Sequence, residues 1–224
     1  MNPSLRLPLP DRTAAGRELA DGLAHLRGRD DLLVLALPRG GVPVADEVAR
    51  ALQAPLDLML VRKLGVPGNR EVAMGAIASG GVMVENPRVM DYLCGLPGMA
   101  RRMQQVIDEE RAELARRERA YRGDRPWPDL RGRCVILVDD GLATGATMRA
   151  AIEAVRAQQP ACIVVAVPVA PPDTVAELRG LVDEVVVPHQ PEPFMAIGQW
   201  YRDFGQVPDE AVREILGRHW QQAG

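Results

Sequence analysis

The sequence predicts an α/β fold, a doubly wound parallel sheet of five strands with helices on both faces. Short apolar runs bounded by turn residues recur along the chain, as expected of parallel strands buried on both faces. Segments with helical spacing alternate with these runs, which favours right-handed βαβ crossovers. At 224 residues the chain has the length of one such domain. We therefore expect one domain over residues 1–224, with a long insertion between the second and third strands (residues 64–132) and a small C-terminal hood (residues 188–224).

The expected elements alternate between strands and helices after one opening helix. Residues 11–27 carry leucines at helical spacing, and Asp11 before them is a suitable N-cap. The expected strands are residues 31–38, 56–61, 134–138, 162–167 and 183–187. The expected helices between them are residues 42–52, 145–158 and 172–180.

Residues 64–132 interrupt this alternation and are too long for an ordinary crossover. The first part, residues 64–85, alternates weakly and is broken by two glycines, which predicts a mobile hairpin. A long helix is expected over residues 99–121, where apolar positions thin out toward a charged end. A solvated helix, a lid and a dimer contact are the roles left open for it.

Composition and charge exclude several classes of protein. The formal net charge of −3 and the pI of about 5.7 argue against a sequence-independent nucleic-acid binder. We expect no membrane association and a cytoplasmic location, because no apolar run approaches the ~20 residues that span a bilayer and no signal-peptide core is present. The three cysteines lack metal-like spacing, and Cys134 and Cys162, which lie in expected strands, are predicted to be buried thiols.

The third expected strand runs into an acidic, glycine-rich loop, VILVDDGLATGATM. Ligands of open parallel sheets bind beyond the carboxyl ends of strands. A helix beginning near Gly145 would offer unpaired N–H groups and the positive end of its dipole, which together favour a phosphate. Thr144 and Thr147 add hydroxyl donors that could equally cap the helix. The alternative to a phosphate site is therefore a capped helix with nothing bound.

The two acids of this loop indicate what lies beside the phosphate. A second phosphate would be repelled by Asp139 and Asp140, whereas vicinal sugar hydroxyls or a divalent metal would fit them. A phosphate and a diol held side by side describe a 5-phosphorylated ribose. The loop matches neither G-x-x-x-x-G-K-[ST] nor G-x-G-x-x-G.

The stretch VILVDDGLATGATM resembles the phosphoribosyl-diphosphate (PRPP) signature of the type I phosphoribosyltransferases. The resemblance implies that Asp139 and Asp140 hold the ribose 2- and 3-hydroxyls. It implies that the 5-phosphate is wrapped by the following residues: Gly141, Leu142, Ala143, Thr144, Gly145, Ala146 and Thr147. It further implies Mg²⁺ bound through PRPP, with the two aspartates as candidate ligands. No other direct metal ligand is expected.

Two further motifs fit this family. The segment ALPRGGVPVA stands where the pyrophosphate loop would be, with charge from Arg39 and amides from Gly40 and Gly41. Family members often have a non-proline cis peptide in this loop, which would lie at or beside Arg39–Gly40.

Arg62–Lys63, at the end of the second expected strand, matches the family's basic pair. The chain has one Lys and 26 Arg, and a compact ammonium suits crowded phosphate oxygens. The candidate catalytic residues are Arg39, Lys63, Asp139 and Asp140.

The family's lid and base-covering hood also have counterparts. Residues 64–85 correspond to the lid, with Arg70 as a candidate cation. The hood segment PHQPEPFMAIGQWYRDF holds four of the eight aromatic residues, which could stack on a heterocycle or form the hood's core. Phe194 resembles the base-stacking aromatic of purine-salvage members. His189 could contact a base or serve as a surface or capping residue.

Two departures bear on the acceptor base. Enzymes for 6-oxopurines have an acid at the position of Ala143 and a Lys at the end of the fourth strand, where this chain has Val167–Pro168. The 6-oxopurine assignment is weakened, and Ala143 is instead typical of adenine- and uracil-type loops. The acceptor base stays open.

Three functions are compatible with these residues. The first is a Mg-dependent phosphoribosyltransferase of nucleotide salvage, which transfers the phosphoribosyl group from PRPP to a nitrogenous base and releases pyrophosphate. The second is a PRPP- or nucleotide-sensing regulatory protein without transfer activity, and the third is an α/β domain with an unrelated ligand. The pyrophosphate loop and the Arg–Lys pair favour catalysis, because a pure sensor would not need both. Type I relatives are commonly dimers, and the sequence alone leaves the oligomeric state open.

Overall fold

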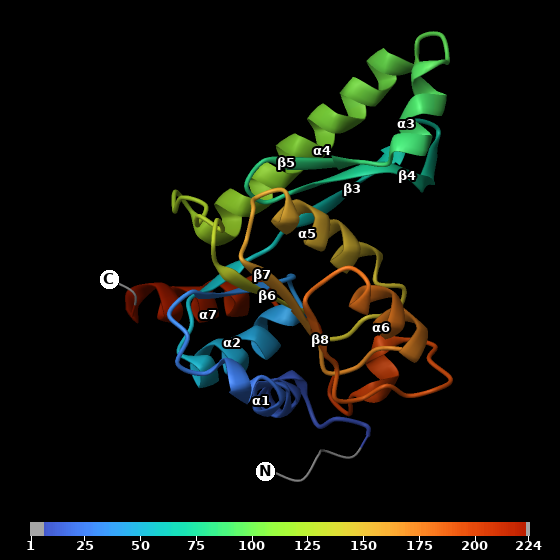
Figure 1. Cartoon of the computed structure of the whole chain (residues 1–224). Helices are drawn as coiled ribbons and strands as arrows, with labels where there is room; N and C mark the ends of the chain where they lie inside the picture. Colours follow the sequence, from blue (N-terminus) through green and yellow to red (C-terminus); the bar gives the residue numbers. More distant parts are fainter. Residues whose placement is uncertain (1–6, 223–224) are drawn as a thin grey trace. The chain divides into compact units, whose positions relative to one another are not determined.

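The computed structural model describes residues 7–222, and the chain forms two compact units (Figure 1). The first unit comprises residues 1–59 together with 129–224, and the second comprises residues 60–128. The second unit overlaps residues 64–132, where an insertion between the second and third strands is expected. Each unit is described by itself.

The first unit is built on a five-stranded parallel sheet, which confirms the predicted fold class. Its strand order is β2-β1-β6-β7-β8. The strands are β1 (Leu32–Ala36), β2 (Leu56–Leu58), β6 (Cys134–Val138), β7 (Cys162–Ala166) and β8 (Glu184–Val186). Every residue of β1 and β6 is buried, because both strands lie inside the sheet with helices above and below.

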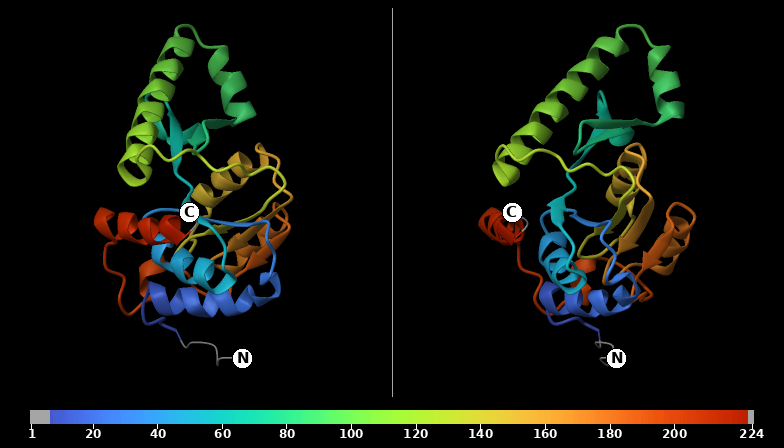
Figure 2. Two further views of the ribbon diagram at one scale, coloured as in Figure 1. Left: turned by 90° about the vertical axis from the view of Figure 1, so that its left-hand side faces the viewer. Right: turned by 60° about the vertical axis from the view of Figure 1, so that its left-hand side comes forward.

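Helices cover both faces of this sheet (Figures 1 and 2). They are α1 (Arg12–Gly22), α2 (Gly41–Leu52), α5 (Ala146–Arg156), α6 (Pro172–Arg179) and α7 (Asp209–Gln222), with short 3-10 turns η1 (Ala24–Leu26) and η2 (Ile197–Trp200). The expected N-cap is confirmed, since the Asp11 side chain accepts a hydrogen bond from the Ala14 N–H at 2.7 Å. The first helix ends at Gly22, earlier than expected, and α7 was not predicted.

The order of the strands creates a point where the sheet topology reverses. From β1 the chain winds outward to β2, whereas from β6 it winds the opposite way to β7 and β8. The carboxyl ends of β1 and β6 are therefore neighbours, and the Leu37 N–H still donates to the Val138 carbonyl at 2.8 Å. Ligands of doubly wound sheets bind at such a switch point.

The second strand was expected over residues 56–61, and the predicted C-terminal limit of this strand is wrong. Strand β2 stops at Leu58, and Val61 begins a separate antiparallel sheet of order β3-β4-β5. The physical reason is that the apolar run of residues 56–61 contributes side chains to the cores of both units. Leu58 is buried in the first unit, while Leu60 and Leu64 are buried in the second.

The second unit packs two helices on the small sheet. Its strands are β3 (Val61–Val66), β4 (Asn69–Ala78) and β5 (Val82–Glu85), and its helices are α3 (Pro87–Cys94) and α4 (Met99–Arg122). The expected long helix is confirmed as α4, whose buried side chains join a core that also includes Met74 and Ile77. Helix α3 was not predicted, although Asn86 is its N-cap and Pro87 its first residue.

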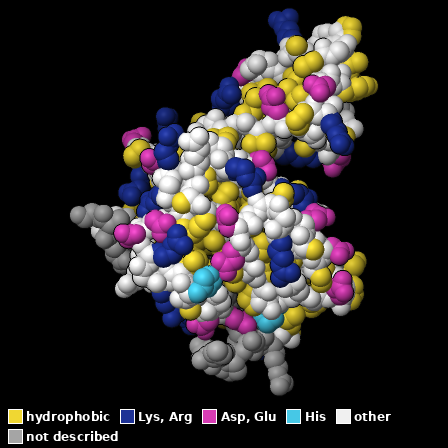
Figure 3. Space-filling view, in the orientation of Figure 1, with side chains coloured by type: hydrophobic (Ala, Val, Ile, Leu, Met, Phe, Trp, Pro, Cys, Tyr) yellow, Lys and Arg dark blue, Asp and Glu magenta, His cyan; other side chains and the backbone are white. Residues whose placement is uncertain are grey.

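The surface mixes charges of both signs. On the face shown in Figure 3, basic and acidic side chains are interspersed. None of the helices in the described part of the chain is both long enough and apolar enough to cross a membrane.

Cys134 and Cys162 form a disulfide, so the prediction of buried thiols is wrong. The two residues are direct partners in the register of β6 and β7, and their Cα atoms are 4.6 Å apart. This separation is within the range that a disulfide spans. The two cysteines are 28 residues apart in the sequence, and this spacing does not predict that they form a disulfide. Cys94 is free and exposed.

We predict that alkylation of the native protein purified without reductant modifies Cys94 alone. After reduction and unfolding, the reagent should modify all three cysteines. Mass spectrometry of tryptic peptides measures both states, and Cys94→Ser provides the control that should show no label before reduction. Labelling of Cys134 or Cys162 in the unfolded but unreduced protein would contradict the disulfide.

Candidate active site

The loop after β6 is open toward solvent where the phosphate was expected. Helix α5 begins behind Gly145, which has a φ of +68°, and no side chain caps the helix. Ala143, Thr144, Ala146 and Thr147 are exposed. The N–H groups of the first helical turn are thus available to an anion, and the alternative of a side-chain cap does not occur.

Contacts beneath this loop fix its shape. The Leu142 N–H donates to the Val169 carbonyl at 3.0 Å, and the Thr174 hydroxyl donates to the Ala143 carbonyl at 2.8 Å. Leu142 itself is buried. These contacts fix the loop on the side of Val169 and Thr174, while Thr144 and Thr147 stay accessible to solvent.

The loop after β1 touches the acid pair. A Cβ on Gly40 would lie 2.0 Å from Asp140 Oδ2, and one on Gly41 would lie 2.8 Å from the Asp139 Cα. Only glycine allows the two loops to come this close. A cis peptide joins Pro38 and Arg39, next to the Arg39–Gly40 bond. The candidate pyrophosphate loop and the candidate ribose acids therefore form one site.

Asp140 is buried and Asp139 is partly buried, and the pKa of each carboxyl group is raised. The Asp139 Oδ1 accepts from the Asp140 N–H at 2.8 Å, and Asp140 is only 7% exposed. Burial and the neighbouring charge of Asp140 raise the pKa of Asp139 well above its usual value. Burial also raises the pKa of Asp140, although the guanidinium of Arg12 acts in the opposite direction. A pair of this kind favours a positive or hydrogen-donating partner.

Arg12, the first residue of α1, supplies such a partner. Its Nε donates to Asp140 Oδ2 at 2.8 Å, its NH1 donates to the Gly205 carbonyl at 2.8 Å, and its guanidinium lies 4.0 Å from the centre of the Phe204 ring. The side chain is 12% exposed. Tyr201 completes this shell by donating its hydroxyl to the Asp140 carbonyl at 2.5 Å.

The sequence reasoning missed these partners. Arg12 is one of 26 arginines, and its position behind an N-cap does not distinguish it. Only the fold brings the start of α1 and the hood to the end of β6. The segment around Leu9 pairs with Tyr201 through an isolated bridge.

Comparisons with known proteins agree with this geometry. Residues 8–195 match the family model described as a phosphoribosyl transferase domain. The chain belongs to this family.

Relatives extend the match over almost the whole chain. The chain is 48% identical over 208 residues to "Putative phosphoribosyl transferase Rv0571c" and "Putative phosphoribosyl transferase MT0597", from two strains of Mycobacterium tuberculosis. The match covers 93% of this chain and 46% of each relative, so the chain spans about half the length of these curated relatives. The crystal structure of TT1426 from Thermus thermophilus superposes with a TM-score of 0.82 at 46% identity, covering 95% of this chain and 98% of that one.

Other expected residues of this phosphoribosyltransferase domain have partners within the chain. Arg39 bonds to Asp209, the first residue of α7, at 3.3 Å. His189 bonds to Glu18 at 2.9 Å, and both side chains are mostly buried, so His189 links the hood to α1.

The hood aromatics differ in their accessibility. Phe194 lies 5.9 Å from Trp200, ring centre to ring centre, and packs against the small core around Leu9 and Tyr201. Phe204 is 36% exposed and lies beside Arg12. Phe204 therefore contacts Arg12, whereas Phe194 packs on the core side of Tyr201.

The expected basic pair lies in β3 of the second unit, so its predicted position at the end of β2 is wrong. The β2 strand ends before these residues because the chain enters the second core there. Arg62 Nε donates to Glu110 Oε2 at 2.7 Å, and Lys63 Nζ donates to the Glu71 carbonyl at 2.7 Å.

We predict that Arg12→Gln destabilises the phosphoribosyltransferase domain by on the order of 3 kcal/mol, because it leaves a buried carboxylate without its partner. Urea unfolding at pH 7 measures this. Arg17→Gln is the matched control, since Arg17 pairs with Glu47 at the surface of the same helix, where less than about 1 kcal/mol is expected. Adding Asp140→Asn to Arg12→Gln should restore part of the loss. Equal effects of Arg12→Gln and Arg17→Gln would refute the buried pair.

We predict that Asp139→Asn raises Tm at pH 8, with a smaller gain at pH 5. A carboxyl whose pKa is raised in the folded state costs stability once the pH exceeds its unfolded pKa, and this cost grows up to the folded pKa. The neutral amide avoids the cost, and its oxygen can still accept from the Asp140 N–H. A gain on the order of 1 kcal/mol corresponds to about 2–4 °C. Calorimetric scans at both pH values would contradict the account if Asp139→Asn lowered Tm equally at each.

Proposed function

We propose that this domain transfers the 5-phosphoribosyl group from PRPP to a nitrogenous base and releases pyrophosphate. The observation that carries the proposal is the uncapped N-terminus of α5 lying directly behind a buried acid pair. Both stand at the point where the sheet topology reverses. This arrangement suits a phosphate joined to a sugar diol.

The 5-phosphate would lie in the open bend. Its oxygens would accept hydrogen bonds from the N–H groups of the first α5 turn and from the hydroxyls of Thr144 and Thr147. Gly141 and Gly145 are part of the bend; a Cβ on Gly145 would lie 2.9 Å from the Thr174 side chain. An anion can reach the bend from solvent, because Ala143, Thr144, Ala146 and Thr147 are exposed.

The ribose hydroxyls would donate to Asp139 and Asp140. Arg12 bonds to Oδ2 of Asp140, which orients the carboxylate and leaves Oδ1 for a hydroxyl. A bound diol would replace part of the solvation that burial removes from these carboxylates. Arg12 thus serves as a positioning residue in this proposal.

The acid pair also fits Mg²⁺. This ion usually binds through one or two carboxylates together with substrate phosphates. No cluster of three or more His, Cys, Asp or Glu residues able to hold a metal is present among residues 7–222. The ion would therefore depend on the oxygens of PRPP, with Asp139 and Asp140 as its protein ligands. When bound, it would neutralise charge on the departing pyrophosphate.

The leaving pyrophosphate would be stabilised by the loop after β1. Arg39 would exchange its bond with Asp209 for the phosphate oxygens, and the N–H groups of Gly40 and Gly41 would donate to developing negative charge. A role of Arg62 and Lys63 in binding PRPP stays a prediction from the family resemblance, because both residues belong to the second unit. The reaction needs no covalent nucleophile, so the residues act by positioning and charge.

The acceptor base would stack on the aromatic hood. Phe194 is the candidate implied by the family resemblance. Phe204 is added because it is 36% exposed and lies beside Arg12, which bonds to Asp140. Ala143 is exposed on the same loop. The identity of the base is left to experiment.

The decisive variant is Asp139→Asn combined with Asp140→Asn. Calorimetric titration should show at least tenfold weaker binding of Mg–PRPP, because two charge-assisted hydrogen bonds to the ribose are lost. Inorganic phosphate binding should change less than twofold. Asp30→Asn with Asp31→Asn is the matched control, an adjacent acid pair that precedes β1.

Turnover is measured by pyrophosphate release from PRPP with a panel of bases. Release with at least one base supports transfer, whereas tight PRPP binding without release would indicate a sensing protein. Unchanged PRPP affinity in the double variant would contradict the assignment of the diol.

A further inference from the structure

Thr174, near the start of α6, touches the bend before α5 on both sides of Thr144. Its hydroxyl donates to the Ala143 carbonyl at 2.8 Å. Its methyl carbon lies 2.9 Å from the position that a Cβ on Gly145 would take. Thr174 is only 7% exposed, so this contact is shielded from water. One buried side chain of α6 therefore holds both neighbours of Thr144.

The hydrogen bond from Thr174 fixes the orientation of the peptide unit between Ala143 and Thr144. A trans peptide unit is planar, and its C=O and N–H groups point in opposite directions. This unit is trans, because the cis bonds within residues 7–222 lie elsewhere. Since the Ala143 carbonyl points toward α6, the Thr144 N–H points away from it. No hydrogen bond within residues 7–222 uses this N–H, so it is available to an anion at the exposed side of the bend.

The other side-chain contact between α5 and α6 is exposed. Arg149 NH1 lies 3.0 Å from Glu177 Oε2, and the two side chains are 37% and 65% exposed. Ion pairs of this kind add little to stability, because water and salt screen them. The buried contact of Thr174 is therefore the one that can hold the bend in a single shape.

We propose that Thr174 is a positioning residue of the phosphate site. This inference rests on the proposed function and adds a residue that lies outside the DDGLATGAT loop. Thr174 does not reach the anion itself; it keeps the Thr144 N–H directed at the 5-phosphate before the substrate arrives. A donor that is already held in place binds an anion more tightly than one that the ligand must first order.

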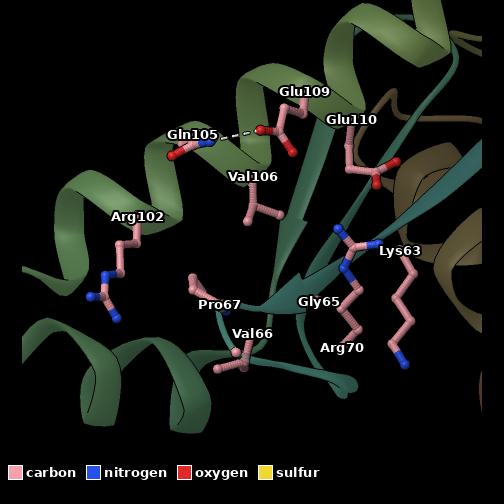
Figure 4. A pocket seen from close by; sticks show the side chains of 11 residues that line it. Lys63, Gly65, Val66, Pro67, Arg70, Arg102, Gln105, Val106, Glu109 and Glu110 are labelled. Atoms are coloured by element: carbon pink, nitrogen blue, oxygen red, sulfur yellow. Dashed lines mark hydrogen bonds between the residues drawn. The ribbon is translucent and has the colours of Figure 1, made fainter.

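Phosphate can also meet cations of the second unit, and the test has to separate the two. A hollow of about 420 Å³ lies between the turn joining β3 to β4 and helix α4, and Lys63, Arg70 and Arg102 are among its lining residues (Figure 4). All three are exposed, and Figure 4 shows Arg102 set apart on α4 from the other two. We assign no ligand to this hollow. Arg102→Gln serves as the control for phosphate bound there.

The test compares Thr174→Val with Thr174→Ser in calorimetric titrations with inorganic phosphate and with ribose 5-phosphate. Valine keeps the shape of threonine without its hydroxyl, whereas serine keeps the hydroxyl. Thr174→Val should weaken binding about tenfold, because one charge-assisted hydrogen bond loses its orientation, and Thr174→Ser should stay within about threefold of the wild type. Val175→Ala, at a buried position of α6 that has no hydroxyl, and Arg102→Gln should each change the affinity by less than about twofold.

The Thr144 amide gives a readout that a purely structural role would not move. Its proton resonance should shift downfield when phosphate is added to the wild type or to Thr174→Ser, because the N–H donates to the anion. The shift should be much smaller in Thr174→Val, while the other amide signals show that this variant is folded. Equal affinities of the wild type and Thr174→Val, or a wild-type Thr144 amide that does not respond to phosphate, would overturn the proposal. An equal loss of affinity in Val175→Ala would also overturn it.

Failure of this inference and failure of the proposed function give different results. If Thr174→Val weakens phosphate binding as expected but no base supports pyrophosphate release, the positioning role stands and transfer is wrong. If pyrophosphate is released while the wild type and Thr174→Val bind phosphate equally, transfer stands and the positioning role is wrong.

Discussion

The close approach of two loops at the switch point of the sheet is the constraint on which the candidate site depends. Gly40 lies so near the Asp140 carboxylate that no side chain could stand between them. The parallel pairing of β1 with β6 sets this distance, because it places both carboxyl ends side by side. A site assembled this way joins a glycine loop and an acid pair that are far apart in sequence.

Burial of two adjacent acids has consequences for the rest of the first unit. Charged groups of one sign do not remain buried together without compensation. Here compensation comes from Arg12 at the start of α1, and the hood holds Arg12 in turn through Gly205 and Phe204. The N-terminal segment and the hood are therefore tied to the end of β6 by the charge of Asp140. The same acids that suit a ribose also organise the structure around it.

Much of the fold follows from sequence patterns, and the exceptions have identifiable causes. The buried strands β1 and β6 are continuous apolar runs, and Asp11 is a recognisable cap. The limits of β2 could not be predicted, because the run from Leu56 to Val61 crosses from one core to another. Helix α7 has a sequence signal in the helical spacing of Val212, Ile215 and Leu216, which the structure shows to be buried.

Side-chain partners were harder to predict than elements. The acid pair, the bend before α5 and the glycine loop after β1 each form a local motif. The Arg12–Asp140 contact joins residues 128 apart, and the Cys134–Cys162 disulfide depends on strand register. Neither leaves a trace in local composition, because each is created by the topology of the sheet.

The central claim is that the bend before α5 and the acid pair together hold a phosphorylated ribose. A crystal structure of the protein with ribose 5-phosphate tests this most directly. The account predicts the phosphate against the N–H groups of the first α5 turn, with the 2- and 3-hydroxyls within hydrogen-bond distance of Asp139 and Asp140. A sugar phosphate bound with its hydroxyls turned toward solvent, or bound away from this bend, would contradict it.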